Sequence, residues 1–329
     1  MKNLLDRRLV TILLLLLVQN SSAFQSHQSA LLVLNKSEST LAIIDPATLK
    51  VLARVPTGEA PHELAASADG RFAFVCNYGT GDRPGNTISV IDIGARKEIK
   101  RVDLGALLRP HGITESHGKI YFTIEGSRAV ARYDPVSGRV DWTMGTGQTG
   151  THMVVAAKTS GKIYTANIGS DTVSAIEPAK GTGTWKITQV AVGKGPEGID
   201  ISPDDREVWV AHRNDGGLSI IDTATDKVKE TIKVGRSPIR VKFTPDGKRV
   251  LVSDAQGNEV VVFDAATRKE LKRIQVGAVP VGILMQPDGR RAFVASTQAN
   301  KVSVINLEDL TLAGTLEPGR EPDGMAWAK

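Results

Sequence analysis

The stretch from Val234 to Ile274 reads VGRSPIRVKFTPDGKRVLVSDAQGNEVVVFDAATRKELKRI, and the chain repeats its pattern from Val276 onward. Glycines that open successive copies stand at Gly235, Gly277 and Gly319, which gives a step of 42 residues. A self-similar period of about 40–45 residues is typical of β-propellers, in which each repeat supplies one blade of four strands. The stretch therefore predicts an all-β chain built from such blades.

Two recurring turns set the number of blades. Seven strands end in an acidic or amide residue, at Asp45, Asp92, Asp134, Glu177, Asp222, Asp264 and Asn306. Asp and Asn favour tight turns because their side chains accept a hydrogen bond from the backbone two residues on. A second hairpin turn, such as the one that starts at Pro245, recurs six times and leaves one blade without an inner strand. The segment from Gly319 to Lys329 supplies that strand.

These counts predict a seven-bladed β-propeller of four-stranded blades. The ring is closed by pairing of the C-terminal inner strand with the N-terminal strands. Closure of this kind removes the exposed sheet edges that otherwise promote aggregation.

Residues 1–23 have the pattern of a secretory signal peptide, with basic residues, an apolar run from Leu9 to Val18 and a small residue, Ala23, at the end. The apolar run is shorter than the roughly 20 residues that span a bilayer. We therefore predict cleavage after Ala23, a flexible lead over residues 24–29 and a single domain over residues 30–329. An uncleaved anchor is the alternative. The predicted location is the periplasm or the cell exterior, with no membrane span after cleavage.

Composition narrows the classes of partner. Cys76 is the only cysteine, so an exported chain would hold no internal disulfide, and we expect a buried, inert thiol. The formal net charge of +5 comes without a block of Lys and Arg, so nucleic-acid binding is not indicated. The expected partners are a small molecule or an envelope protein, and we expect a monomer.

Four segments carry a family resemblance: Phe74–Tyr78 (FVCNY), Ile163–Asn167 (IYTAN), Val208–His212 (VWVAH) and Val250–Asp254 (VLVSD). Each is followed by a polar loop and another strand. The repeat resembles the YVTN family of β-propeller repeats, which includes YncE-like periplasmic proteins, over residues 30–329. The resemblance implies the propeller fold. Lactonase-type propellers and the haem-binding propellers of some nitrite reductases share comparable repeats, and no motif here selects either.

A Gly-x-x-Pro signature precedes most inner strands, and the residue after the proline can be compared around the ring. In order these residues are His62, His111, His152, Glu197, Ile239, Val281 and Asp323; one copy is longer, and Thr151 replaces the proline in another. Because inner strands begin at the channel mouth, the five polar members form one arc on neighbouring blades.

Imidazoles together with a carboxylate are a normal ligand set for Zn, Fe, Cu or Mn. We therefore predict one divalent transition-metal ion at the channel mouth, with ligands among His62, His111, His152, Glu197 and Asp323. The alternative is a polar channel lining that holds no metal.

The loops after the following strands reach the same face, and long loops on a rigid scaffold often carry binding residues. Candidate ligand contacts are Asn77, Tyr78, Arg83, His212 and Arg240. For His212 the alternative is a structural hydrogen bond at the end of a strand.

The chain lacks a Gly-rich phosphate loop, a nucleophile elbow and a CxxC motif. The sequence therefore favours an exported scaffold that binds a ligand, a metal or a partner through its His-rich mouth. The alternative is a metal-assisted hydrolase or lyase of the lactonase-like propeller type. In that enzyme the His arc would hold the ion, and Glu197 or Asp323 would move protons.

Overall fold

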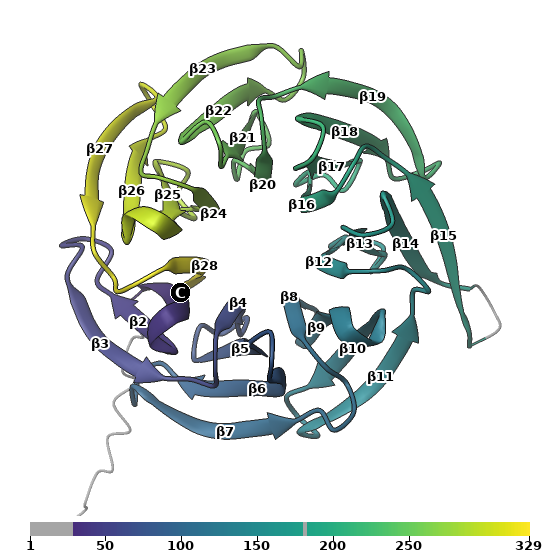
Figure 1. Ribbon diagram of the computed structural model, residues 1–329, viewed down its shortest axis with the longest axis vertical. Helices are drawn as coiled ribbons and strands as arrows, with labels where there is room; N and C mark the ends of the chain where they lie inside the picture. Colours follow the sequence, from purple (N-terminus) through teal and green to yellow (C-terminus); the bar gives the residue numbers. More distant parts are fainter. Residues whose placement is uncertain (1–28, 180–182) are drawn as a thin grey trace, which may run out of the picture.

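The computed structural model describes residues 29–179 and 183–329, which form seven four-stranded antiparallel sheets arranged around one axis (Figure 1). The predicted seven-bladed propeller is thereby confirmed. The predicted signal peptide and the first residues of the lead lie outside the described residues. No helix within the described ranges is long and apolar enough to cross a membrane.

Six blades follow the chain in order, each running from the inner to the outer strand. Their strands are β4 (Pro61–Ala66), β5 (Phe72–Gly79), β6 (Pro84–Asp92) and β7 (Lys97–Asp103); β8 (Pro110–Ser116), β9 (Lys119–Ile124), β10 (Ala129–Asp134) and β11 (Arg139–Gly145); β12 (Thr151–Ala156), β13 (Ile163–Asn167), β14 (Thr172–Pro178) and β15 (Trp185–Ala191); β16 (Pro196–Ile201), β17 (Glu207–His212), β18 (Gly217–Asp222) and β19 (Lys227–Lys233); β20 (Pro238–Phe243), β21 (Arg249–Asp254), β22 (Glu259–Asp264) and β23 (Glu270–Gln275); β24 (Pro280–Met285), β25 (Arg291–Ser296), β26 (Lys301–Asn306) and β27 (Thr311–Leu316). Short 3-10 turns follow three of the second strands: η1 (Lys36–Glu38), η2 (Glu125–Ser127) and η3 (Thr297–Ala299).

The seventh blade joins the two ends of the described chain. Strand β28 (Pro322–Ala328) pairs with β1 (Ala30–Asn35), which continues into β2 (Thr40–Ile44) and β3 (Val51–Pro56). In this register Leu31 faces Trp327. The purple and yellow strands lie side by side in Figure 1, as the predicted closure requires.

The core lies between the blades and is built from their middle strands. Strand β1 is buried at every residue, whereas the outer strand β11 alternates between exposed and half-buried positions. Strands buried on both faces need apolar residues throughout, which explains runs such as β9 and β17. Trp209 and Phe243 from neighbouring blades pack with ring centroids 5.4 Å apart.

The glycine of the Gly-x-x-Pro signature makes room for a polar side chain at the end of the second strand. Asn77 accepts a hydrogen bond from the backbone N–H of Gly58 at 3.0 Å, and Asp254 accepts one from Ser237 at 2.8 Å. A Cβ on Gly58 would lie 2.4 Å from Asn77 Cγ, and one on Gly235 would lie 2.0 Å from Asp254 Oδ2. The signature therefore fixes the segment from which each inner strand begins.

Candidate functional site

Three imidazoles form a continuous row at the start of neighbouring inner strands. His62, His111 and His152 are each the second residue of their strand, on β4, β8 and β12. His62 Nδ1 lies 3.0 Å from His111 Nε2, and the rings of His111 and His152 stack with centroids 3.9 Å apart. The shared register position thus brings the three side chains together.

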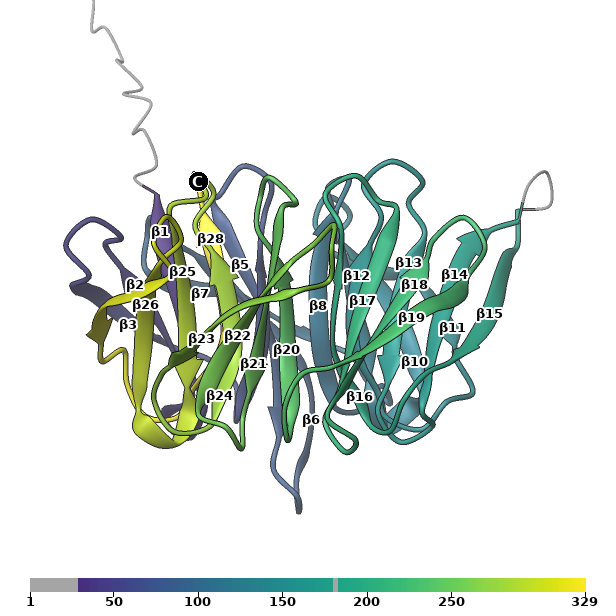
Figure 2. The ribbon, with the colours of Figure 1, turned by 90° about the horizontal axis from the view of Figure 1, so that it is seen from above.

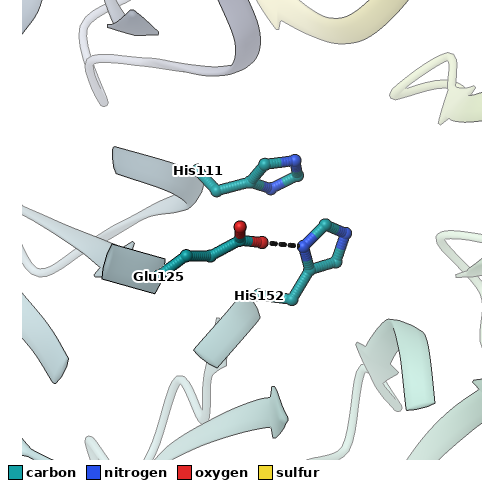
Figure 3. Close-up of side chains that lie close together, drawn as sticks. All are labelled: His111, Glu125 and His152. Carbon is teal, nitrogen blue, oxygen red and sulfur yellow. Dashed lines mark hydrogen bonds and ion pairs between the residues drawn. The ribbon is translucent and has the colours of Figure 1, made fainter. Parts of the chain in front are cut away.

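Glu125, the first residue of η2, completes the cluster and was not among the predicted site residues. Its Oε1 atom pairs with His152 Nδ1, and its Oε2 atom accepts a hydrogen bond from the Tyr78 hydroxyl at 2.5 Å. Figure 3 shows the side chains of His111, Glu125 and His152 turned toward one another. One ligand atom from each of the three lies within 4.8 Å of the other two.

The position of Glu125 in the repeat is a signal that could have revealed it. It follows the last residue of β9, and the strand register places Lys36, Tyr78 and Arg213 at the equivalent position in other blades. These side chains also reach the mouth, since Arg213 Nη1 lies 2.8 Å from Glu197 Oε2. Two register positions, one on each of the two innermost strands, therefore build the site.

The two predicted carboxylates lie in different surroundings. Glu197 Oε1 lies 3.8 Å from His152 Nε2, so Glu197 joins the histidine row. Asp323 pairs instead with Lys36, whose Nζ lies 3.7 Å from its Oδ2 atom. Burial raises the pKa of the Asp323 carboxyl, while Lys36 acts in the opposite direction.

Arg240 crosses the channel beneath the cluster and is almost fully buried. Its Nε donates to the carbonyl of Val281 at 3.0 Å, its Nη1 lies 3.5 Å from Met153 Sδ, and its Nη2 pairs with Glu63. These contacts join four blades. A channel cavity of about 680 Å³ is bordered by Arg240 and Glu63 and extends to His117 at the other end of β8.

Two of the predicted ligand contacts, His212 and Asn77, accept hydrogen bonds from backbone N–H groups. His212 is fully buried, and its Nε2 accepts a hydrogen bond from the N–H of Gly193 at 3.3 Å. A Cβ on Gly193 would lie 2.1 Å from the His212 ring. His212 and Asn77 occupy the same repeat position and hold the segment that leads into the inner strand. The hydrogen bond from Gly193 is of the kind that the structural alternative for His212 expects.

The remaining two candidates lie near the mouth. The Tyr78 ring stacks on His62 with centroids 4.5 Å apart, and the Arg109 guanidinium lies 5.0 Å from the Tyr78 centroid. Arg83 lies in the hairpin between β5 and β6, which protrudes beyond its face in Figure 2. Its exposed side chain pairs with Glu59 at 2.6 Å. Tyr78 thus belongs to the cluster, and Arg83 belongs to its rim.

Burial and neighbouring groups shift the pKa values of the three histidines in different directions. Desolvation, with a smaller contribution from Lys36, lowers the pKa of His62 to about 4. Desolvation and the neighbouring imidazoles hold the pKa of His111 well below its usual value. Burial is the largest influence on His152 and acts to lower its pKa, but the hydrogen bond and the charge of Glu125, together with the charge of Glu197, outweigh it and raise that pKa. At neutral pH, His62 and His111 are therefore neutral.

One atom of the cluster stands out. His111 Nδ1 is buried and has no hydrogen-bond partner among the described residues. A neutral imidazole with an unused nitrogen lone pair is the form that ligates metal ions. The cluster therefore offers two imidazoles and one carboxylate as a compact set of donor atoms.

The sequence matches the family model of the YNCE-like beta-propeller over residues 15–192 and that of the cytochrome D1 heme domain over residues 111–290. No curated protein matches the chain.

Three solved structures illustrate the similarity of fold. Kuenenia stuttgartiensis hydrazine synthase is 21% identical with a TM-score of 0.73, and the match covers 84% of this chain and 92% of that one. The periplasmic gluconolactonase PpgL of Pseudomonas aeruginosa is 19% identical with a TM-score of 0.75, over 92% and 99% of the two chains. The dihydro-heme d1 dehydrogenase NirN is 16% identical with a TM-score of 0.66, over 88% of this chain and 64% of that one.

At these identities the three structures show only that the fold is shared. The assignment of the chain to a family rests on the matches to family models. Each family match spans more than half of the chain. The cytochrome D1 heme domain match covers the inner strands that carry His152 and Glu197. With the repeat, the blade count and the first match in agreement, the protein belongs to the YNCE-like β-propeller family.

Proposed function

We propose that this protein is an exported binding propeller whose channel mouth holds one divalent transition-metal ion on His111, Glu125 and His152. The observation that carries the proposal is His111 Nδ1, which is buried and lacks a partner in the described part of the chain. His111 also belongs to a group of three residues whose ligand atoms, one from each residue, lie within 4.8 Å of one another. Two imidazoles and a carboxylate suit Zn, Fe, Cu or Mn.

A channel lining without metal explains this atom less well. A buried polar group that makes no hydrogen bond costs about 1–3 kcal/mol. Some polar side chains at the ends of the strands are bonded to one another, as Asn167 is to Ser174 at 2.9 Å, whereas Ser296 Oγ, like His111 Nδ1, has no partner among the described residues. An ion bound to His111 Nδ1 would satisfy this nitrogen.

The export part of the proposal rests on the signal-like pattern of residues 1–23. Sequencing the N-terminus of the protein recovered from the periplasm tests it. A mature chain that starts at Phe24 is the expected result, and a chain retained in the membrane with its leader intact would contradict it.

Metal titration of untagged, chelator-treated protein tests the binding function. Wild type should bind one equivalent of Co²⁺, and His111→Ala should lose this binding. His117→Ala is the matched control because His117 lies at the far end of the same strand and is exposed. Wild type without measurable binding would overturn the proposal.

The match to the cytochrome D1 heme domain raises the question of whether iron would be held in a haem. The rings of His62, His111 and His152 pack against one another, and the 680 Å³ channel cavity is bordered by other residues. The three rings do not border this cavity, and we favour a bare ion. The absorption spectrum of the purified protein checks this, because a haem would give an intense band near the violet end of the visible spectrum.

A metal-assisted hydrolase or lyase is the second candidate. Three protein ligands leave a coordination position open for water, which is typical of catalytic zinc sites. Glu197 lies beside His152 and could move a proton. Lactone hydrolysis that stops on chelation and in His111→Ala would support this function. Hydrolysis whose rate is unchanged by chelation and by His111→Ala would exclude a metal-assisted reaction.

A further inference from the structure

We infer that both histidines of the proposed metal centre ligate through Nδ1, and that His62 and Glu197 position them by holding their Nε2 atoms. This inference rests on the proposed function and adds two residues to it. Neither His62 nor Glu197 then contacts the ion. For His62 this replaces the role of ligand that its place in the repeat predicted.

The hydrogen bond to His62 determines which nitrogen of His111 is available. His111 Nε2 lies 3.0 Å from His62 Nδ1, so one of the two nitrogens carries the shared proton. If His111 Nε2 donates, His111 Nδ1 keeps its lone pair. The other arrangement of neutral rings puts a proton on His111 Nδ1, where no acceptor within residues 29–179 and 183–329 forms a hydrogen bond with it. Satisfying all the donors therefore selects Nδ1 of His111 as the ligand.

His152 has a carboxylate behind its Nε2 atom, at an ion-pair distance longer than a hydrogen bond. Its Nδ1 faces Glu125, on the side where His111 lies in Figure 3. Its Nε2 faces Glu197 Oε1 at 3.8 Å, and Arg213 holds the other oxygen of Glu197 at 2.8 Å. A carboxylate behind a ligating histidine fixes the tautomer and orientation of the ring. Glu197 is placed to do this for His152.

Tyr78 connects the positioning residues to the third ligand. Its ring stacks on His62 at 4.5 Å, while its hydroxyl donates to Glu125 Oε2 at 2.5 Å. The Arg109 guanidinium covers the Tyr78 ring at 5.0 Å. The orientations of His62 and Glu125 are therefore linked through one rigid side chain.

Two substitutions of His62 separate positioning from packing. His62→Asn keeps an acceptor near the place of Nδ1, whereas His62→Leu fills the space without one. We expect His62→Leu to weaken Co²⁺ binding about 10- to 100-fold, the usual effect of losing a residue behind a ligand. His62→Asn should stay within a few-fold of wild type. A residue that acts only by packing would give equal effects or the reverse order.

Proton NMR of the Co²⁺ form gives a direct readout of the two tautomers. Wild type should show two exchangeable, paramagnetically shifted imidazole N–H signals, from Nε2 of His111 and of His152. In His62→Leu one signal should be lost to solvent exchange, and in His62→Asn it should persist. Glu197→Leu should remove the other signal, and it keeps the test decisive if the His62 variants fail to fold.

The possible results separate this inference from the proposed function. Wild type that binds no Co²⁺ would overturn the proposed function. Wild type that binds Co²⁺, with His62→Leu and Glu197→Leu equally tight and both signals intact, would overturn the inference and leave the function in place. Equal losses in His62→Asn and His62→Leu would also contradict it, because a direct ligand behaves in that way.

Discussion

Arg240 on β20 and Glu63 on β4 form a buried ion pair across the axis of the propeller, between blades that are not neighbours in the ring (Figure 1). About a tenth of each side chain is exposed. The pair borders the channel cavity and links opposite sides of the ring.

Breaking this pair from one side should destabilise the protein strongly. Arg240→Met leaves the Glu63 carboxylate buried without its partner, which typically costs about 3–5 kcal/mol. The double variant Arg240→Met/Glu63→Leu should recover much of that loss. Urea denaturation measures the free energy of unfolding of each. The control is Arg83→Met, which breaks an exposed pair and should cost no more than about 1 kcal/mol.

Ring closure by β28 should be essential for folding. Removing residues 322–329 deletes the inner strand of the seventh blade and leaves the polar backbone groups of β1 unpaired. Such groups are costly when buried and promote aggregation when exposed. We expect loss of the cooperative thermal transition, followed by circular dichroism. Removal of Lys329 alone is the control, and a truncated chain that melts like wild type would show that closure is dispensable.

The turn aspartate Asp134 should make stability depend on acid pH. Hydrogen bonds from Lys119 and the backbone N–H of Val136 lower its pKa to about 2. In the unfolded chain an aspartate titrates near pH 4, so the folded state gains stability above about pH 4 and loses it as the pH falls toward 2. The difference in unfolding free energy between wild type and Asp134→Asn should therefore shrink over this range. An equal difference at pH 6 and pH 2 would argue against the assignment.

Cys76 should be inert in the native protein. Its thiol is fully buried, and burial raises its pKa well above the usual value. Because the thiolate is the reactive form, Ellman's reagent at pH 8 should modify the protein only after denaturation. Rapid reaction of one thiol equivalent in native protein would mean that the blade opens near Cys76.

The sequence predicts the fold well because every blade uses the same local contacts and turns. Gly58 and Gly235 leave room for Asn77 and Asp254, and residues such as Asp134 begin the outer turns. These requirements repeat with the period of the blades and can be read without knowledge of the tertiary structure. The positions of His62, His111 and His152 follow from the same period.

Contacts between side chains that occupy different positions of the repeat could not be predicted in the same way. Glu125 follows Ile124, where other blades carry Asn, Asp, His or Ser, so the polar residue that marks this position elsewhere is missing here. His212 could equally have faced a ligand, because an imidazole can bond to backbone or to a bound molecule. Only the three-dimensional arrangement decides between these roles. The pairing of Arg240 with Glu63 depends on the diameter of the ring, which no local pattern encodes.

Anomalous diffraction from crystals soaked in zinc tests the metal centre most directly. The account predicts one strong peak at the channel mouth, about 2.0–2.2 Å from His111 Nδ1, His152 Nδ1 and a carboxylate oxygen of Glu125. A cluster without any peak, or an ion bound to the protein only elsewhere, would contradict it.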